Sequence, residues 1–283
     1  MGRVAIVTDS AADLPVELAA QRGIAVVPLI VTFGSESYRA NVDITTEAFW
    51  ARMTAPGAPF PSTAASSPGA FQQAFEEAFA AGAEAIVCVD IAGTLSATIK
   101  SAQIARDALP DREIHVVDTW SASMGTGLLA LLAAELRDAG ASASEIAANV
   151  SARIKDLRLY VALETLEYLK RGGRISGARA ALGTILSVKP IITVENGQVE
   201  QADRVRTRTK ARERLFELLG VAPVERLAVL HGMTPEIESF AAGLVARIPG
   251  GVPADRIVIT PVGPSIGPHL GPGCFGAVIL LRA

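Results

Sequence analysis

Apolar runs and helical segments alternate through the first half of the chain. Four runs rich in β-branched residues are continuous, as in strands buried on both faces, and they occupy 4–9, 24–33, 84–92 and 113–118. Helical segments are predicted between several of them. Strand–helix alternation of this kind is typical of βαβ units. We therefore expect a parallel, Rossmann-like sheet with helices on both faces.

One helix is marked by both its cap and its apolar stripe. Ser67 precedes Pro68, which is tolerated in a first helical turn because its missing N–H would be unpaired there anyway. Phe71, Phe75 and Phe79 then follow four residues apart. This spacing predicts a helix that turns its phenylalanine side toward the core rather than toward a cofactor.

Two further helix starts carry cap signals. Asp13 precedes a Leu-Pro pair and is predicted to be the N-cap of a helix that ends near Gly23. Ser142 and Glu145 have the spacing of a capping box.

The pattern changes in the second half of the chain. A strand at 157–163 is followed by a short helix, and Asn196-Gly197 forms the preferred two-residue turn of a hairpin. A hairpin followed by helix, strand, helix and strand predicts a mixed sheet. We expect an α/β protein of two domains, 1–156 with the parallel sheet and 157–283 with the mixed sheet. The ligand tunnel is expected between them.

Composition fits this plan and narrows the function. The chain has 283 residues, half of them apolar, which is enough for two packed domains. With 26 basic and 29 acidic residues the net charge is −3, which argues against a general nucleic-acid binder. Cys88 and Cys274 form no CxxC motif and do not require an oxidising compartment. We expect a cytoplasmic protein without a transmembrane segment, since its most apolar helix, 127–136, is too short to span a bilayer.

Small hydroxyl side chains gather in two places near predicted helix starts. The stretch 59–71 holds Ser62, Thr63, Ser66 and Ser67, and Ser96 follows the strand at 84–92. Ligands of parallel sheets bind at the carboxyl ends of the strands, and hydroxyls there can donate to a carboxylate or phosphate. The alternative is that these serines only cap helices, which is the better interpretation for Ser67.

A glycine- and proline-rich stretch at 261–276 contains His269. Such a loop can shape the mouth of a ligand site. It can also be a tight return between two strands, with the histidine solvated.

Motifs of nucleotide, metal and hydrolase chemistry are missing from the sequence. It has no P-loop, no G-x-G-x-x-G after the first strand and no G-x-S-x-G elbow, and its three histidines lack zinc-site spacing. We therefore expect no metal site and no cofactor. Gly125 and Gly127 form an isolated pair that is interpreted as easing close helix packing.

Basic residues are concentrated at 203–214. Alternation predicts that Arg204, Arg206 and Arg208 share one face of a strand. Arg174 and Arg179 lie near a glycine-rich turn. These side chains form either a solvated edge or a docking surface for an acidic partner or a phosphate.

The order of these motifs resembles the DegV family over nearly the whole chain. The matching segments are VAIVTDSAADLP, PSTAASSPGAF, DIAGTLSATIKSAQIA, VVDTWSASMGTGLLA, LETLEYLKRGGRISGARAALGTILSVKPIITVENG, RVRT and IGPHLGPGCFG. The long block from Leu163 to Gly197 is the most specific of them.

The resemblance implies a two-domain α/β fold that buries a long-chain fatty acid in a tunnel. It implies that Thr63 and Ser96 hold the carboxylate and that His269 lies near it. The protein would be a non-catalytic lipid-binding carrier that presents the acid to a separate ATP-dependent fatty acid kinase, for acyl phosphate formation and phospholipid synthesis.

Within that system Arg174, Arg204 and Arg206 are candidates for kinase docking. Ala97 and Ile99 depart from the residues common in the family and are expected to alter the choice of acyl chain. The alternative function is an enzyme in its own right, either a Ser/His hydrolase or a phosphotransferase like the dihydroxyacetone kinases.

Overall fold

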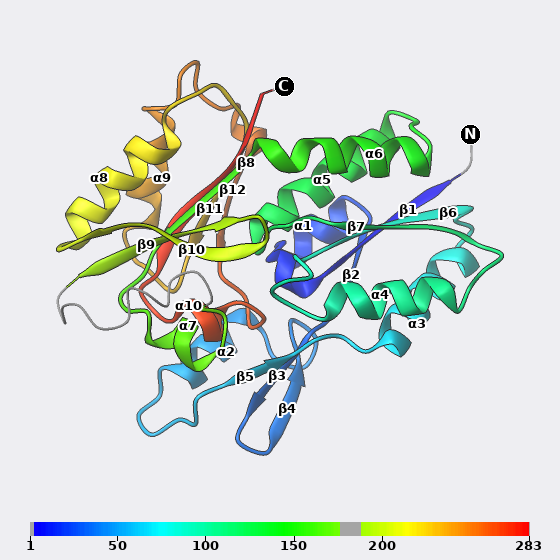
Figure 1. Ribbon diagram of the computed structural model, residues 1–283, viewed down its shortest axis with the longest axis horizontal. Helices are drawn as coiled ribbons and strands as arrows, with labels where there is room; N and C mark the ends of the chain where they lie inside the picture. Colours follow the sequence, from blue (N-terminus) through cyan, green and yellow to red (C-terminus); the bar gives the residue numbers. More distant parts are fainter. Residues whose placement is uncertain (1–2, 176–187, 283) are drawn as a thin grey trace.

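A four-stranded parallel sheet forms one half of the molecule. The computed structural model describes residues 3–175 and 188–282 (Figure 1). The strand order is β2-β1-β6-β7, with β1 (Val4–Asp9), β2 (Ile24–Val27), β6 (Ala85–Asp90) and β7 (Glu113–Asp118). All three strand pairs are parallel, as the apolar runs predicted.

Helices cover both faces of the parallel sheet. The helices that follow its strands are α1 (Val16–Gln21), α3 (Pro68–Ala80), α4 (Thr98–Asp107), α5 (Met124–Asp138) and α6 (Ala143–Arg153). One apolar cluster joins α3 and α4 to one face, and a second joins α5 and α6 to the other. The expected α/β architecture is confirmed.

The other half of the molecule is built on a six-stranded mixed sheet of order β10-β9-β8-β13-β11-β12. Its strands are β8 (Leu157–Ala162), β9 (Lys189–Glu195), β10 (Gln198–Val205), β11 (Val224–His231), β12 (Ile257–Pro261) and β13 (Phe275–Leu281). β11 and β12 are parallel and the other pairs antiparallel. α8 (Arg208–Leu219) and α9 (Ile237–Val245) cover its outer face (Figure 1). The remaining helices of this half are α7 (Glu167–Arg171) and α10 (Gly267–Leu270).

The predicted hairpin is confirmed. Asn196 and Gly197 both have positive φ, 49° and 73°, as a two-residue turn between β9 and β10 requires. The predicted boundary between 156 and 157 falls between the short turn Ile154–Asp156 and β8, and it stays a prediction.

The apolar run at 24–33 is two strands, not the single strand predicted. β2 ends at Val27, and β3 (Ile30–Phe33) joins β4 (Glu36–Arg39) and β5 (Ser62–Ala64) in a small antiparallel sheet. Pro28 cannot donate to a sheet ladder. The N–H of Leu29 turns instead to Ser10 Oγ, at 2.8 Å. α2 (Thr46–Met53) lies between β4 and β5 in the chain and was also not predicted.

Two of the three helix caps agree with the sequence. Ser67 Oγ accepts the N–H of Ala70, and Phe71 and Phe75 are fully buried. Ser142 forms its capping box. The prediction for Asp13 is wrong, because it ends the short helix Ser10–Ala12 with φ of 51° and α1 begins only at Val16. Its carboxylate is buried and bonded elsewhere.

α5 lies between the two large sheets and contacts strands of both, as Figure 1 shows. Its residues from Met124 to Ala134 are all buried. A Cβ on Gly127 would lie 2.7 Å from the carbonyl oxygen of Ala12, and one on Gly125 would lie 2.1 Å from Ser121 Oγ. These glycines therefore permit the close helix packing that the sequence predicted.

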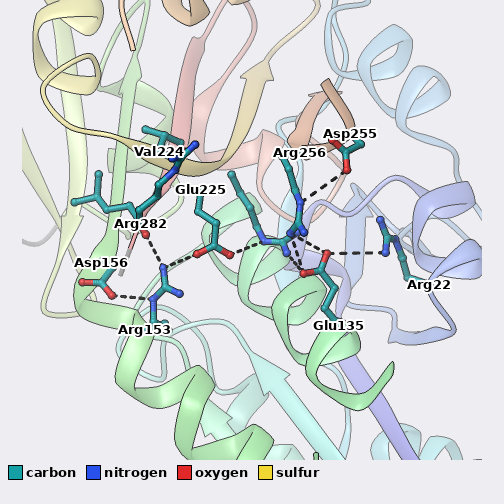
Figure 2. A network of polar contacts seen from close by, with 11 residues as sticks. Arg22, Glu135, Arg153, Asp156, Val224, Glu225, Asp255, Arg256 and Arg282 are labelled. Carbon is teal, nitrogen blue, oxygen red and sulfur yellow. Dashed lines mark hydrogen bonds and ion pairs between the residues drawn. The ribbon is translucent and has the colours of Figure 1, made fainter. Parts of the chain in front are cut away.

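An ion-pair network joins the far end of α5 to the mixed sheet (Figure 2). The Glu135 carboxylate pairs with Arg226 of β11, with Arg256 at 2.9 Å and with Arg22 at 3.9 Å. The Arg226 side chain is only 4 % exposed, and burial lowers its pKa. Glu135 thus compensates a buried cation that would be costly to leave alone.

Replacing Glu135 tests this network. Glu135→Gln removes the charge that faces the buried Arg226, and we expect the free energy of unfolding to fall by roughly 2–4 kcal/mol. Asp138→Asn on the same helix is the control. It breaks only the exposed pair with Arg137 and should cost under about 1 kcal/mol. Equal losses in urea titrations of the two variants would contradict the assigned role.

Candidate functional site

A narrow cavity lies between the carboxyl ends of the parallel strands and the inner face of the mixed sheet. Its apolar lining includes Leu29 and Ile91 beside the first sheet, and Leu159, Ile192 and Leu230 from the second. About 70 Å³ is open to the centres of water-sized spheres. A single water needs about 10–15 Å³ on that measure. The space is therefore small, and its walls are mostly aliphatic.

Six polar side chains also line the cavity. They are Thr63, Ser96, Ser123, Arg174, Ser265 and His269. The three head-group residues expected from the sequence, Thr63, Ser96 and His269, are therefore brought to one cavity from β5, the β6–α4 loop and α10.

Thr63 and His269 are hydrogen-bonded partners. Thr63 Oγ1 lies 3.0 Å from His269 Nε2. Burial, and secondarily the positive charge of Arg174, lowers the pKa of His269 to about 4, so the ring is neutral at pH 7. Its Nδ1 is buried and has no hydrogen-bond partner among residues 3–175 and 188–282, and it lies close to Gly172, where a Cβ would lie 2.1 Å from it.

This geometry favours one tautomer of His269. A buried ring N–H without an acceptor is costlier than a bare ring nitrogen, so the proton belongs on Nε2. Nε2–H then donates to Thr63 Oγ1, and the hydroxyl proton of Thr63 is free to be donated to a ligand.

Ser96 lies in the turn that connects β6 to α4. Its Oγ accepts the N–H of Thr98 at 3.3 Å and lies 2.8 Å from Thr98 Oγ1. The expectation that this serine supports the start of a helix is thus met, although Ala97 is the formal N-cap. Ser96 also lines the cavity, and its contact with a ligand stays a prediction.

Arg174 connects two segments of the cavity wall by hydrogen bonds. Its Nε donates to the carbonyl of Leu95 at 3.1 Å, and its Nη1 donates to Gly172 at 2.8 Å. The chain after α7 is thereby fixed to the turn that carries Ser96. The half-buried guanidinium also places a positive charge in the cavity wall.

The buried carboxylate of Asp13 holds three segments around the cavity. It accepts the N–H of Gly263 at 2.9 Å and the hydroxyl of Ser123 at 2.5 Å. Ser123 opens α5 with φ of 53°, a strained value for a serine. Desolvation raises the pKa of Asp13 to about 7, and the negative charge of Asp9 adds a smaller effect.

A second buried carboxylate, that of Asp9, holds two segments of the cavity wall in place. Asp9 accepts the N–H groups of Ala11 at 2.7 Å and Ile91 at 2.8 Å, two residues of the cavity wall. Burial raises the pKa of Asp9 to about 6.

Sequence reasoning missed Asp13, Ser123 and Ser265 as parts of this site. Ser265 Oγ lies 2.8 Å from Ser10 Oγ, and the two residues are 255 positions apart in the chain. The glycine- and proline-rich composition of 261–276 was a signal for a ligand mouth. No local pattern indicated which partners its side chains would meet.

The serines that line the cavity have hydrogen-bond partners other than histidine. Ser96 meets Thr98, Ser123 meets Asp13 and Ser265 meets Ser10. Within residues 3–175 and 188–282 no hydrogen bond joins a serine to a histidine. The same residues contain no group of three or more His, Cys, Asp or Glu side chains that could hold a metal. The arrangement suits binding of an elongated apolar molecule with a polar end.

The basic stretch is not a single strand. β10 ends at Val205, so Arg206 lies in a turn and Arg208 begins α8, with Thr207 as the N-cap. The prediction that three arginines share one strand face is therefore wrong. Arg208 bonds internally to Glu164 at 3.0 Å.

The two remaining docking candidates of this stretch, Arg204 and Arg206, are exposed. Neither has an ion pair with a described residue. Arg179 falls outside the described residues.

Comparison with known proteins decides the family. The family described as "Uncharacterised protein, DegV family COG1307" matches residues 3–282. The chain belongs to the DegV family. A DegV domain-containing protein of Streptomyces coelicolor is 37 % identical over 284 residues, which cover 99 % of both chains. Protein DegV of Bacillus subtilis is 31 % identical over 278 residues, 96 % of this chain and 97 % of that one.

Solved structures share the fold over nearly the whole of this chain. A DegV family protein from Thermus thermophilus, described by its fatty acid binding, is 35 % identical with a TM-score of 0.89, over 99 % of this chain and all of that one. DegV of Bacillus subtilis, described as a fatty acid binding protein, is 30 % identical with a TM-score of 0.88 over the whole of both chains. A stearic acid-binding protein from Eubacterium ventriosum is 27 % identical with a TM-score of 0.88, over 99 % of this chain and 98 % of that one.

No helix in the described part of this DegV chain has both the length and the apolar character needed to cross a membrane.

The raised pKa of Asp13 predicts a pH-dependent stability. Between 3.8, its ordinary pKa, and about 7, the folded chain keeps a proton that the unfolded chain releases. Stability therefore falls as pH rises through this range. Asp13→Asn removes the effect. The free energy of unfolding of this variant, relative to that of the natural chain, should rise from about pH 5 to about pH 8, by at most about 1.4 kcal/mol per pH unit. Parallel pH profiles in thermal unfolding would contradict the assignment.

Proposed function

We propose that this chain is a non-catalytic fatty acid carrier that presents the carboxylate of its ligand to a separate ATP-dependent kinase. One observation carries the first part of the proposal. A small, mostly aliphatic cavity has in its wall a neutral hydroxyl–imidazole pair, Thr63 with His269, and a second hydroxyl, Ser96. The fatty acid binding described for solved DegV relatives supports the same ligand class.

The apolar lining accounts for most of the expected affinity. Burying a saturated tail contributes about 0.8 kcal/mol per methylene, so a dozen methylenes contribute on the order of 10 kcal/mol before ordering costs. A hydrogen bond to a charged carboxylate contributes roughly 1.5–3 kcal/mol. The tail would therefore determine affinity, and the polar set would determine which end of the ligand faces it.

The electrostatics of the polar set suit an anion. His269 is neutral and leaves the Thr63 hydroxyl free to donate, and Arg174 adds a positive charge in the same wall. Nothing in this set removes a proton from a nucleophile. A ligand carboxylate would be held there without being consumed.

The kinase part of the proposal follows from the position of these groups. Thr63 and Ser96 are half-buried, so a carboxylate bound to them would lie near the surface. The exposed Arg204 and Arg206 offer positive charge to an acidic partner, as the sequence suggested.

Hydroxyl removal tests ligand binding. Thr63→Val keeps the shape of the side chain and Ser96→Ala removes the second donor. Each should weaken oleate or palmitate binding by roughly ten- to hundredfold, because one charged hydrogen bond is lost. Retention is measured by native mass spectrometry of the purified protein. Ser67→Ala is the matched control, since Ser67 is in the same loop but caps α3 and does not line the cavity.

A protein that purifies free of lipid and takes up neither acid when they are added would refute the carrier. Retention that is unchanged in both hydroxyl variants would instead refute the assigned head-group residues.

Charge reversal tests docking. The double variant Arg204→Glu/Arg206→Glu should keep its bound lipid and lose at least tenfold in kinase-dependent acyl phosphate formation, because repulsion replaces attraction at the surface. Arg112→Glu, an exposed arginine of the α4–β7 connection, is the control and should leave the rate unchanged.

Both variants are assayed with and without the kinase. Acyl phosphate formed from ATP and fatty acid by this chain alone would contradict the carrier and favour an enzyme.

A further inference from the structure

The mixed sheet contains a fork between β8 and β9. The two strands pair only at Val161 with Ile192 and at Ala162 with Ile191. Continued antiparallel pairing would set Leu159 opposite Val194, but no pairing occurs there. β8 pairs with β13 along its whole length on the other side, so the gap belongs to the β9 side alone.

The fork forms a surface groove. Its walls are residues 157–160 of β8 and 193–196 at the end of β9, and its rim includes Trp120 and Ile154. Trp120 is 50 % exposed and has φ of 50°. A large aromatic side chain is thus held beside the opening by an unusual backbone conformation.

The groove and the lipid cavity share two wall residues. Leu159 and Val194 line both spaces. One layer of side chains therefore separates the interior cavity from the outside at the place where the sheet is open. Thr63, Ser96 and His269 line the cavity and not the groove. The polar set and the fork therefore lie at different parts of the cavity wall.

We propose that the fork is the tail end of the lipid site. Leu159 and Val194 set the length of acyl chain that fits inside, and a longer chain passes between them into the groove, where its end contacts Trp120. This inference rests on the proposed binding of a fatty acid. It adds the residues that select chain length and a second opening through the mixed sheet.

Physical reasons favour a tail as the occupant. Two aliphatic side chains separate the cavity from the fork. An acyl chain can displace them without leaving a polar group unpaired. Each methylene that leaves water for the fork strengthens binding by about fourfold. Trp120 offers an apolar surface to a chain end that would otherwise be in water.

Chain-length selection is the first test. Leu159→Ala and Val194→Ala should shift preference from palmitate toward arachidate and behenate, by up to about fourfold for each methylene that the widened gap admits. Val161→Ala and Ile192→Ala are the matched controls. They are the neighbouring inward-facing residues on the same strands, line only the cavity and lie where the strands are paired. Competition among equimolar acids is read by native mass spectrometry.

A bulky substitution gives the opposite expectation. Val194→Phe should close the gap and shift preference toward shorter acids such as myristate. Equal shifts in the fork and control variants would overturn the proposal, because enlargement anywhere in the cavity would then explain them.

The second test locates the end of the chain in the natural protein. Arachidate brominated at its terminal carbon should quench the fluorescence of Trp120, and arachidate brominated beside the carboxylate should not. The Trp120 contribution is obtained as the difference between the natural chain and Trp120→Phe, since the chain has two tryptophans and Trp50 is buried.

The outcomes separate the two proposals. Bound acid that leaves Trp120 unquenched by the terminal bromine overturns the fork and keeps the carrier. No bound acid in any variant overturns the carrier, and the fork with it.

Discussion

The buried carboxylate of Asp13 joins three segments that surround the cavity. Asp13 accepts hydrogen bonds from Ser123 and Gly263, so the end of the first strand, the start of α5 and the loop before α10 are fixed to one side chain. Its desolvation is costly, as its raised pKa shows. In return, the hydrogen bonds of Asp13 hold the segment that carries Ser265 and His269 in a fixed position. A ligand bound in the cavity as proposed would meet these groups already in place and would not have to order them.

Local rules predicted much of the fold. The continuous apolar runs gave the parallel strands, Asn196-Gly197 gave the hairpin and Ser67 gave the start of α3, because each feature is governed by nearby residues. The prediction of a single strand at 24–33 was wrong because the break in this run depends on a residue outside it. Its break depends on Leu29 turning to Ser10, a contact that appears only after the chain has folded back.

The family resemblance predicted part of the membership of the candidate site, but not its geometry. The family resemblance identified Thr63, Ser96 and His269, and the structure places all three at one cavity. The hydrogen bond between Thr63 and His269 joins residues 206 positions apart. The unpaired Nδ1 of the histidine lies where a side chain at Gly172 would collide with it. Neither has a local signature. Arg208 shows the same limit, since its alternation with Arg204 suggested a strand and the Thr207 side chain begins a helix instead.

The central position of α5 has a consequence for how the molecule exchanges its contents. The helix is buried against both sheets, and Gly127 leaves no room for it to slide past the chain at Ala12. Separating the two large sheets would expose the buried apolar residues of α5 to water and break the ion pairs of Glu135. If the chain binds a fatty acid as proposed, uptake and release would therefore favour small displacements of the short segments around α5 over separation of the two sheets.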